Sequence, residues 1–181
     1  FGVAGEGYAA IALPGGGWAG SLNAFESGKG YWFISNYDFD FSYGVPSRGD
    51  NALGRNIIRQ TTVEVPSAYR YAQSMNQQFF FVEEATIDGE PLEAGDWIVS
   101  YNGDVVVGAR MWTGEYTDVP VMGYDGSDIS SIMTAGYCDA GDVITFKVYD
   151  ASQDRLVDMD SAEPTAWVGN NAMSVISMTD K

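Results

Sequence analysis

Short apolar or β-branched segments, each ended by Gly, Asp, Asn or Pro, follow one another along the chain, and this pattern constrains the fold most. Between Tyr37 and Tyr43, for example, aromatic residues alternate with Asp and Ser. A period of two is expected of a half-buried strand, because successive side chains point to opposite faces. No window keeps apolar residues at a helical spacing for three turns. The sequence therefore predicts an all-β domain with no helix longer than about two turns.

Turn signals divide the chain into roughly ten short strands, which is typical of a β-sandwich or a jelly roll. Outside the hairpin described next, strands are expected at 8–13, 31–43, 57–65, 77–87, 143–149, 155–159 and 173–178. A chain of 181 residues with 45% hydrophobic content can bury one sizeable core. No change of composition marks a linker, so we expect a single domain over residues 1–181.

The strongest local signal is a hairpin over residues 96–110. Asn102-Gly103 lies between two β-rich arms, and this pair favours a type I′ turn because both central residues need φ above zero. The register that follows pairs Val99 with Val106 and Ile98 with Val107. Both faces are then apolar, so we expect burial on both sides of the hairpin. The side chains expected to be buried there are Trp97, Ile98, Val99 and Val106.

Charge and residue content exclude several classes of function. With 9 Lys and Arg against 25 Asp and Glu, the net charge is −16, which disfavours binding to nucleic acids and to anionic membranes. No apolar run is long enough to insert into a bilayer. The chain contains no His, which removes Ser-His-Asp and Cys-His catalysis as well as imidazole metal sites. These absences argue against an enzyme.

The remaining reactive groups give little reason to expect catalysis. Carboxylates are plentiful, so a glycosidase with two of them would be the most plausible enzyme, but no motif places such a pair. The only thiol, Cys138, is expected to be a small buried hydrophobe. The chain begins at Phe1 rather than Met, which indicates either that a signal peptide has been removed or that this is an excised segment. The acidic, turn-rich composition suits an extracellular or cell-surface protein.

Turns rich in Asp suggest a calcium site, because a hard cation prefers carboxylate and carbonyl oxygens. The candidate ligands are Asp118, Asp125, Asp128, Asp150, Asp154 and Asp158. None of these loops has the spacing of an EF-hand. The competing interpretation is that each Asp caps its own turn through its side chain. Calcium is therefore the one cofactor that the sequence suggests, and no other is expected.

Aromatic residues at strand ends suggest a surface for sugars, since exposed rings stack on pyranose faces in β-sandwich binding modules. The candidates for stacking are Trp18, which follows three Gly, together with Trp112 and Tyr124. For each residue the alternative is burial in the core or at an interface. The partner expected from this hypothesis is a polysaccharide.

A series of short motifs gives residues 77–167 a recognisable order. They are Gln77–Val82, Ile87-Asp88-Gly89, Gly95–Ile98, Tyr101–Asp104, Val107–Arg110 with Trp112, Asp118–Gly126 and Thr145–Ser152. This region resembles β-rich modules, without assigned activity, of large secreted surface proteins of environmental bacteria. The resemblance implies an extracellular, non-catalytic module and supplies no catalytic residues. Residues 1–76 lie outside it.

The Gly- and Ala-rich N-terminal segment suggests a way for such a module to assemble. Residues 3–13 are uncharged apart from Glu6, so this segment could add as a strand to the sheet of a neighbouring copy. Its candidate contact residues are Val3, Tyr8, Ala10, Ile11 and Leu13. The alternative is that the segment pairs within its own domain. Our first hypothesis is therefore a structural subunit of a surface layer, filament or adhesive assembly, with copies of itself or other surface proteins as partners. The second is a calcium-dependent carbohydrate-binding module.

Overall fold

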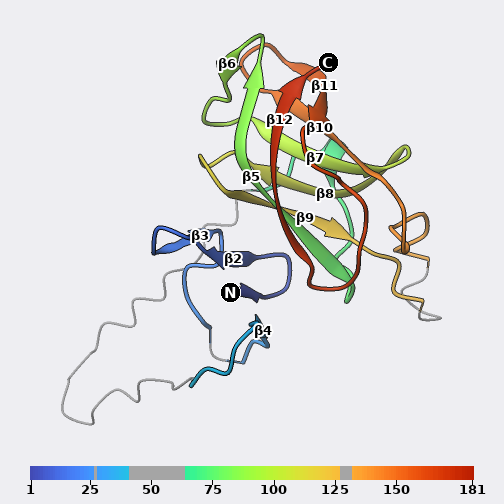
Figure 1. Cartoon of the computed structure of the whole chain (residues 1–181). Helices are drawn as coiled ribbons and strands as arrows, with labels where there is room; N and C mark the ends of the chain where they lie inside the picture. The colour runs from blue at the N-terminus through green and yellow to red at the C-terminus, as the bar shows by residue number, and fades with distance from the viewer. Residues whose placement is uncertain (27, 41–63, 127–131) are drawn as a thin grey trace, which may run out of the picture.

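The computed structural model describes residues 1–26, 28–40, 64–126 and 132–181, and almost all of their regular structure is β (Figure 1). The strands are β1 (Gly2–Ala4), β2 (Ala9–Ala12), β3 (Trp18–Gly20), β4 (Trp32–Ile34), β5 (Gln77–Ile87), β6 (Glu90–Pro91), β7 (Trp97–Asn102), β8 (Val105–Met111), β9 (Thr117–Met122), β10 (Ile144–Asp150), β11 (Arg155–Ser161) and β12 (Met173–Asp180). Within these ranges the only helical segment is the 3-10 turn η1 (Ser67–Tyr69), and no helix could cross a membrane. The predicted all-β, sandwich-like fold is confirmed.

The N-terminal residues form a small antiparallel sheet, shown in blue in Figure 1, with strand order β3-β2-β1-β4. Val3 lies opposite Ala10 on one side and opposite Phe33 on the other, so these three side chains share one face. Ala4 lies opposite Ala9 on the other face. We refer to this four-stranded unit as the small sheet. Its Gly and Ala content lets the strands lie close against other elements.

The remaining strands form one larger sheet with the order β6-β5-β12-β11-β10-β7-β8, in which β9 also pairs with β5. Most pairs are antiparallel, but β12 and β5 run parallel, from Met173 opposite Phe79 to Thr179 opposite Thr86. The long strand β5 has β12 on one edge and both β9 and β6 on the other. We refer to this unit as the curled sheet.

The curled sheet bends until β8 lies against β9. An ideal Cβ built at Gly108 in β8 would overlap the backbone carbonyl oxygen of Pro120 in β9. Ser100 Oγ donates to the same carbonyl at 3.1 Å, and Arg110 Nε donates to the Asp118 carbonyl at 2.9 Å. Proline cannot donate a ladder hydrogen bond, so its place at this junction fits an edge strand. The contact between β8 and β9 is therefore made by the side chains of Ser100 and Arg110 and by the close approach that Gly108 allows.

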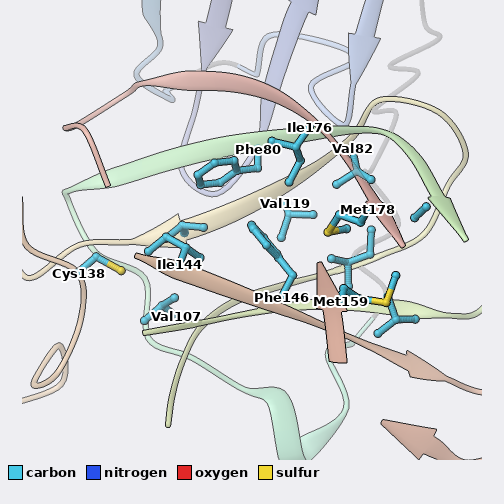
Figure 2. Close-up of a cluster of buried hydrophobic side chains, with 14 of the residues drawn as sticks. Phe80, Val82, Val107, Val119, Cys138, Ile144, Phe146, Met159, Ile176 and Met178 are labelled. Carbon is cyan, nitrogen blue, oxygen red and sulfur yellow. The ribbon is translucent and has the colours of Figure 1, made fainter. Parts of the chain in front are cut away.

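The interior of the curled sheet is filled by apolar side chains from every side (Figure 2). The labelled residues Phe80, Val119, Ile144, Phe146 and Ile176 point toward one another, and their exposed fractions are close to zero. The rings of Phe80 and Phe146 meet edge to face with centroids 5.3 Å apart. A core of this size supplies the hydrophobic stabilisation that the chain needs without a disulfide.

The predicted hairpin is present, but the register predicted for it is wrong. The turn contains Gly103 and Asp104, and Asn102 remains in the strand opposite Val105. Gly103 has φ of 57°, and Asp104 is not among the residues with positive φ, which suits a turn with glycine at its first central position. The Asn102 side chain donates to Asp142 Oδ2 at 2.9 Å, and this contact holds the asparagine outside the turn.

A bulge after Ser100 shifts the pairing further along the hairpin. As a result Val99 lies opposite Ala109, and Ile98 lies opposite Arg110, rather than opposite Val106 and Val107 as predicted. Burial on both faces is nevertheless confirmed. Ile98 packs in the interior of the curled sheet, while Trp97 and Val99 pack in a second cluster beneath Tyr69 and Tyr71. Val106 is half-buried at the edge of that second cluster.

Other strand predictions are confirmed in part. Residues 77–87 form β5 with the predicted bounds, but 31–43 contributes only β4, and 41–43 and 57–63 lie outside the described residues. The sequence did not predict β9, and Asp118 was expected in an Asp-rich turn as a candidate calcium ligand. In the structure Asp118 lies in the strand, where its side chain is buried against the small sheet.

The contact between β8 and β9 predicts a strong dependence on Gly108. The Gly108→Ala variant should lose on the order of 3 kcal/mol of unfolding free energy, because the added methyl group meets fixed backbone rather than a flexible side chain. Gly30→Ala is the matched control, since nothing lies within 4 Å of the position its Cβ would take. Urea unfolding of both variants checks the prediction, and equal midpoints would contradict it.

Candidate functional site

The two sheets pack together through the outward-facing side chains of β5. Phe79 and Phe81 point away from the core of the curled sheet and form a buried cluster with Ala4 and Ala9 of the small sheet. Because the facing residues on β1 and β2 are alanines, the backbones approach closely enough for polar groups to connect the sheets. The functional surfaces described below all depend on this packing.

Asp118 in β9 is the central polar contact between the sheets, and its exposed fraction is 1%. Its Oδ1 accepts a hydrogen bond from the Ser21 backbone N–H at 2.8 Å. Its Oδ2 accepts from the Ala9 N–H at 3.0 Å and from Ser21 Oγ at 2.7 Å, and it lies 3.3 Å from Arg110 Nη2. Burial raises the pKa of the Asp118 carboxyl, while Arg110 and the hydrogen bonds oppose that rise.

Gln77 and Arg110 make further links to the loop between β1 and β2. Gln77 Nε2 donates to the Gly5 carbonyl at 2.6 Å, and Gln77 Oε1 accepts from the Gly7 N–H at 2.9 Å. Arg110 donates to the Gly7 carbonyl, and its guanidinium lies 5.1 Å from the centroid of the Tyr8 ring. Neither Gln77 nor Arg110 stands out in the sequence as a link between sheets, because their partners are distant in the chain.

The face of the small sheet that points away from the curled sheet carries a cavity of about 500 Å³. Its apolar lining, which we call the aromatic groove, comprises Val3, Ala10, Phe1, Trp18, Phe25, Phe33 and Phe39. Three ring contacts connect part of it, with centroid distances of 6.2 Å for Phe1–Phe39, 5.8 Å for Phe33–Phe39 and 5.7 Å for Phe25–Phe33. Trp18 is 58% exposed. A contiguous exposed apolar surface of this kind is typical of an interaction site.

The predicted assembly segment is paired within its own chain. β1 lies between β2 and β4, and β2 lies between β1 and β3, so the segment has a neighbour on both sides. Val3 and Ala10 line the aromatic groove, whereas Ile11 faces the curled sheet. Tyr8 is half-buried beneath Arg110, and the Leu13 N–H donates to the Gly17 carbonyl at 3.1 Å. Whether copies associate stays a prediction.

The predicted sugar-stacking residues lie in three different places. Trp18 lines the aromatic groove, and Trp112 is half-buried against the interior of the curled sheet. Tyr124 follows β9, and its carbonyl accepts a hydrogen bond from Asn76 Nδ2 at 2.8 Å. The structure therefore does not bring these three rings into one platform.

The predicted calcium ligands are also dispersed, and several already have protein partners. Asp118 lies between the sheets, while Asp150 accepts from the Ser152 hydroxyl at 2.8 Å and lies 3.2 Å from Arg155 Nε. Asp154 accepts from the Tyr149 hydroxyl at 2.8 Å, and Asp158 pairs with Lys147 at 2.7 Å. Asp150 matches the alternative that an Asp caps its own turn, because it also accepts from the Gln153 N–H, whereas Asp118, Asp154 and Asp158 have other partners.

The other two predicted ligands follow β9. Asp125 is half-buried, and Asp128 lies outside the described residues. Among the residues whose positions are described, no group of three or more potential ligands lies together. Calcium binding stays a prediction.

Cys138 is buried next to the interior of the curled sheet, with 1% of its surface exposed. Burial, with smaller contributions from Asp142 and Asp139, raises the pKa of its thiol to about 12. The thiol is therefore protonated at neutral pH and shielded from solvent, which suits a packing role.

Comparisons of this chain with family models, with curated proteins and with solved structures found no match.

The environment of Asp118 predicts that its charge holds the sheets together. Asp118→Asn keeps the shape of the side chain but leaves Arg110 without a counter-ion. It also replaces one accepting oxygen by an amide NH₂ group, which faces the N–H and O–H donors of Ala9 and Ser21. We expect a loss of about 3 kcal/mol in urea unfolding followed by tryptophan fluorescence. Asp158→Asn is the control, because this exposed ion pair with Lys147 should contribute less than about 1 kcal/mol. Equal effects of the two variants would contradict the assignment.

The burial of Cys138 predicts that a thiol reagent will not label the folded protein. At mildly alkaline pH we expect labelling to require unfolding, since the thiol is both protonated and covered. The rate of reaction with a disulfide reagent, measured with and without urea, checks this. Rapid stoichiometric labelling of the folded chain would show that the region around Cys138 opens.

Proposed function

We propose that this chain is a non-catalytic extracellular structural module, a subunit of a surface layer, filament or adhesive assembly. The aromatic groove is the observation that carries the proposal, because it exposes several large rings on one face of the small sheet. The absence of His supports a role without catalysis. The resemblance of residues 77–167 to modules of secreted surface proteins supports an extracellular location.

Charge favours the aromatic groove as the contact between copies. A net charge of −16 makes most of the molecular surface repel a second copy. The residues that line the aromatic groove carry no charged side chain, so association there brings few carboxylates together. Exposed aromatic side chains are also the residues that contribute most to binding at protein interfaces. We therefore infer that copies meet through this face.

Strand addition at the small sheet gives such an assembly a direction. Among the strands that the structure describes, β3 and β4 each have only one neighbour in the small sheet, whereas the strands of segment 3–13 have two. An unpaired strand edge offers backbone N–H and C=O groups to another chain. In our proposal, β3 or β4 therefore replaces the N-terminal segment as the strand that pairs with a neighbour, and the aromatic groove packs beside it.

Point variants test this proposal better than a deletion, because removing residues 1–13 would remove two inner strands of the small sheet. We expect the full chain to self-associate in sedimentation experiments, and more strongly as added salt screens the like charges. Trp18→Ser should weaken association roughly 30-fold, corresponding to the loss of an aromatic contact worth about 2 kcal/mol. Val168→Ser is the matched control, since Val168 is an exposed apolar residue in the part of the chain that forms the curled sheet.

The outcomes separate clearly. A chain that stays monomeric at high concentration and high salt contradicts the proposal, as does equal weakening by Trp18→Ser and Val168→Ser. Calcium added at constant ionic strength should strengthen association if Asp carboxylates bridge two copies. A chelator should then reverse that effect.

A further inference from the structure

A second cavity, of about 510 Å³, lies between the small sheet and the curled sheet, where the two are joined by Arg110. We call it the intersheet cleft. Tyr8 and Asn23 line it from the N-terminal residues, and Trp97 and Arg110 line it from β7 and β8. Tyr71 lines it from the segment that covers β7 and β8. Its volume falls within the range of roughly 300–1,000 Å³ that pockets for small molecules occupy.

Several polar groups that line the intersheet cleft have no hydrogen-bond partner in the part of the chain that the structure describes. Within the described ranges, no hydrogen bond is made by the hydroxyls of Tyr8 and Tyr71 or by the side-chain amide of Asn23. Gln73 donates through Nε2 to Ser74 and Gln77, which leaves its Oε1 without a donor. Burial raises the pKa of the Tyr71 hydroxyl, which therefore remains protonated and available as a donor. Tyr8 and Tyr71 are half-buried, and Asn23 and Gln73 are exposed, so their polar groups are open to the cleft and can exchange hydrogen bonds with a ligand that has hydroxyls of its own.

The charges in the intersheet cleft favour a neutral ligand. Arg110, the cation that lines the cleft, is paired with Asp118 at 3.3 Å, and its guanidinium lies over the Tyr8 ring. Glu6, the acid that lines the cleft, lies 3.5 Å from Lys29. Among the described residues that line the cleft, both charged side chains are therefore paired, and neither is left to select an anion or a cation. The rest of the lining combines polar residues with apolar ones, and Trp97 and Met111 are among the apolar residues.

We propose that the intersheet cleft binds a neutral saccharide. Such a ligand presents apolar C–H faces that pack against the aromatic and aliphatic lining, and hydroxyls that exchange hydrogen bonds with Tyr71, Tyr8 and Asn23. The cleft lies between the sheets and the aromatic groove lies on the opposite face of the small sheet, so they are two cavities, although Gly20 and Asn23 line both. The proposal does not depend on self-association.

The residues that form the intersheet cleft come from parts of the chain far apart in sequence, which explains why sequence analysis chose other aromatic residues. Trp18, Trp112 and Tyr124 follow recognisable strand ends, whereas Tyr8 and Tyr71 become neighbours only when the small sheet docks. A saccharide bound here would contact both sheets. Its binding should therefore raise the midpoint for unfolding of the whole chain.

The test uses the full chain on an array of immobilised neutral and acidic oligosaccharides, followed by saturation-transfer NMR with the neutral sugars that bind. Tyr71→Phe keeps the ring and removes only the hydroxyl, and Asn23→Ala removes only the amide. Neither group has a hydrogen-bond partner among the described residues, so both variants should unfold at the same urea concentration as the parent chain. Each should weaken binding about tenfold. Tyr124→Phe removes the hydroxyl of a residue that does not line the cleft, and it should leave binding unchanged.

Any one of four results overturns the proposal. They are no binding to a neutral saccharide, binding to acidic saccharides only, parent-like binding by both Tyr71→Phe and Asn23→Ala, and loss of binding in Trp18→Ala with retention in Tyr71→Phe. The last result would place the sugar in the aromatic groove instead.

Discussion

A buried carboxylate, Asp118, holds the two sheets of this protein together. Its oxygens accept hydrogen bonds from Ala9 and Ser21 of the N-terminal residues, and Arg110 lies beside them. A charge removed from water costs free energy unless several donors surround it, so this arrangement is stable only when the small sheet is docked. The same Arg110 contacts the backbone of β9 and thereby helps to close the curled sheet. One ion pair thus serves both the closure and the docking.

Both candidate surfaces follow from that arrangement. Docking turns the alanine side of the small sheet inward, onto Phe79 and Phe81, and leaves Val3 and Ala10 facing outward among aromatic rings. It also creates the intersheet cleft, where polar groups from both units face a shared cavity. The strongly negative charge of the chain then limits which partners can approach: an uncharged aromatic face and a neutral cleft are where repulsion between carboxylates matters least.

The fold class and the longest strand could be predicted because their signals are local. The apolar run of β5 and the absence of any helical period need no knowledge of distant residues. The register of the hairpin could not be predicted from local signals, because Asn102 is held in its strand by Asp142, which is 40 residues away. The role of Asp118 could not be predicted either. The sequence shows a carboxylate in a turn-like context, but it does not show which donors surround that carboxylate. Tyr71 escaped notice for the same reason, because only docking places it in a cleft.

The central claim is that the small sheet is an integral part of the fold rather than a loosely attached extension. Native-state hydrogen exchange of the full chain tests it directly, through the amides of Gly7, Ala9 and Ser21, which donate to side chains of the curled sheet. The account predicts that these amides open with free energies within about 1 kcal/mol of those in β5, as in a single cooperative unit. Exchange of these three amides near the unprotected rate, while β5 stays protected, would contradict it.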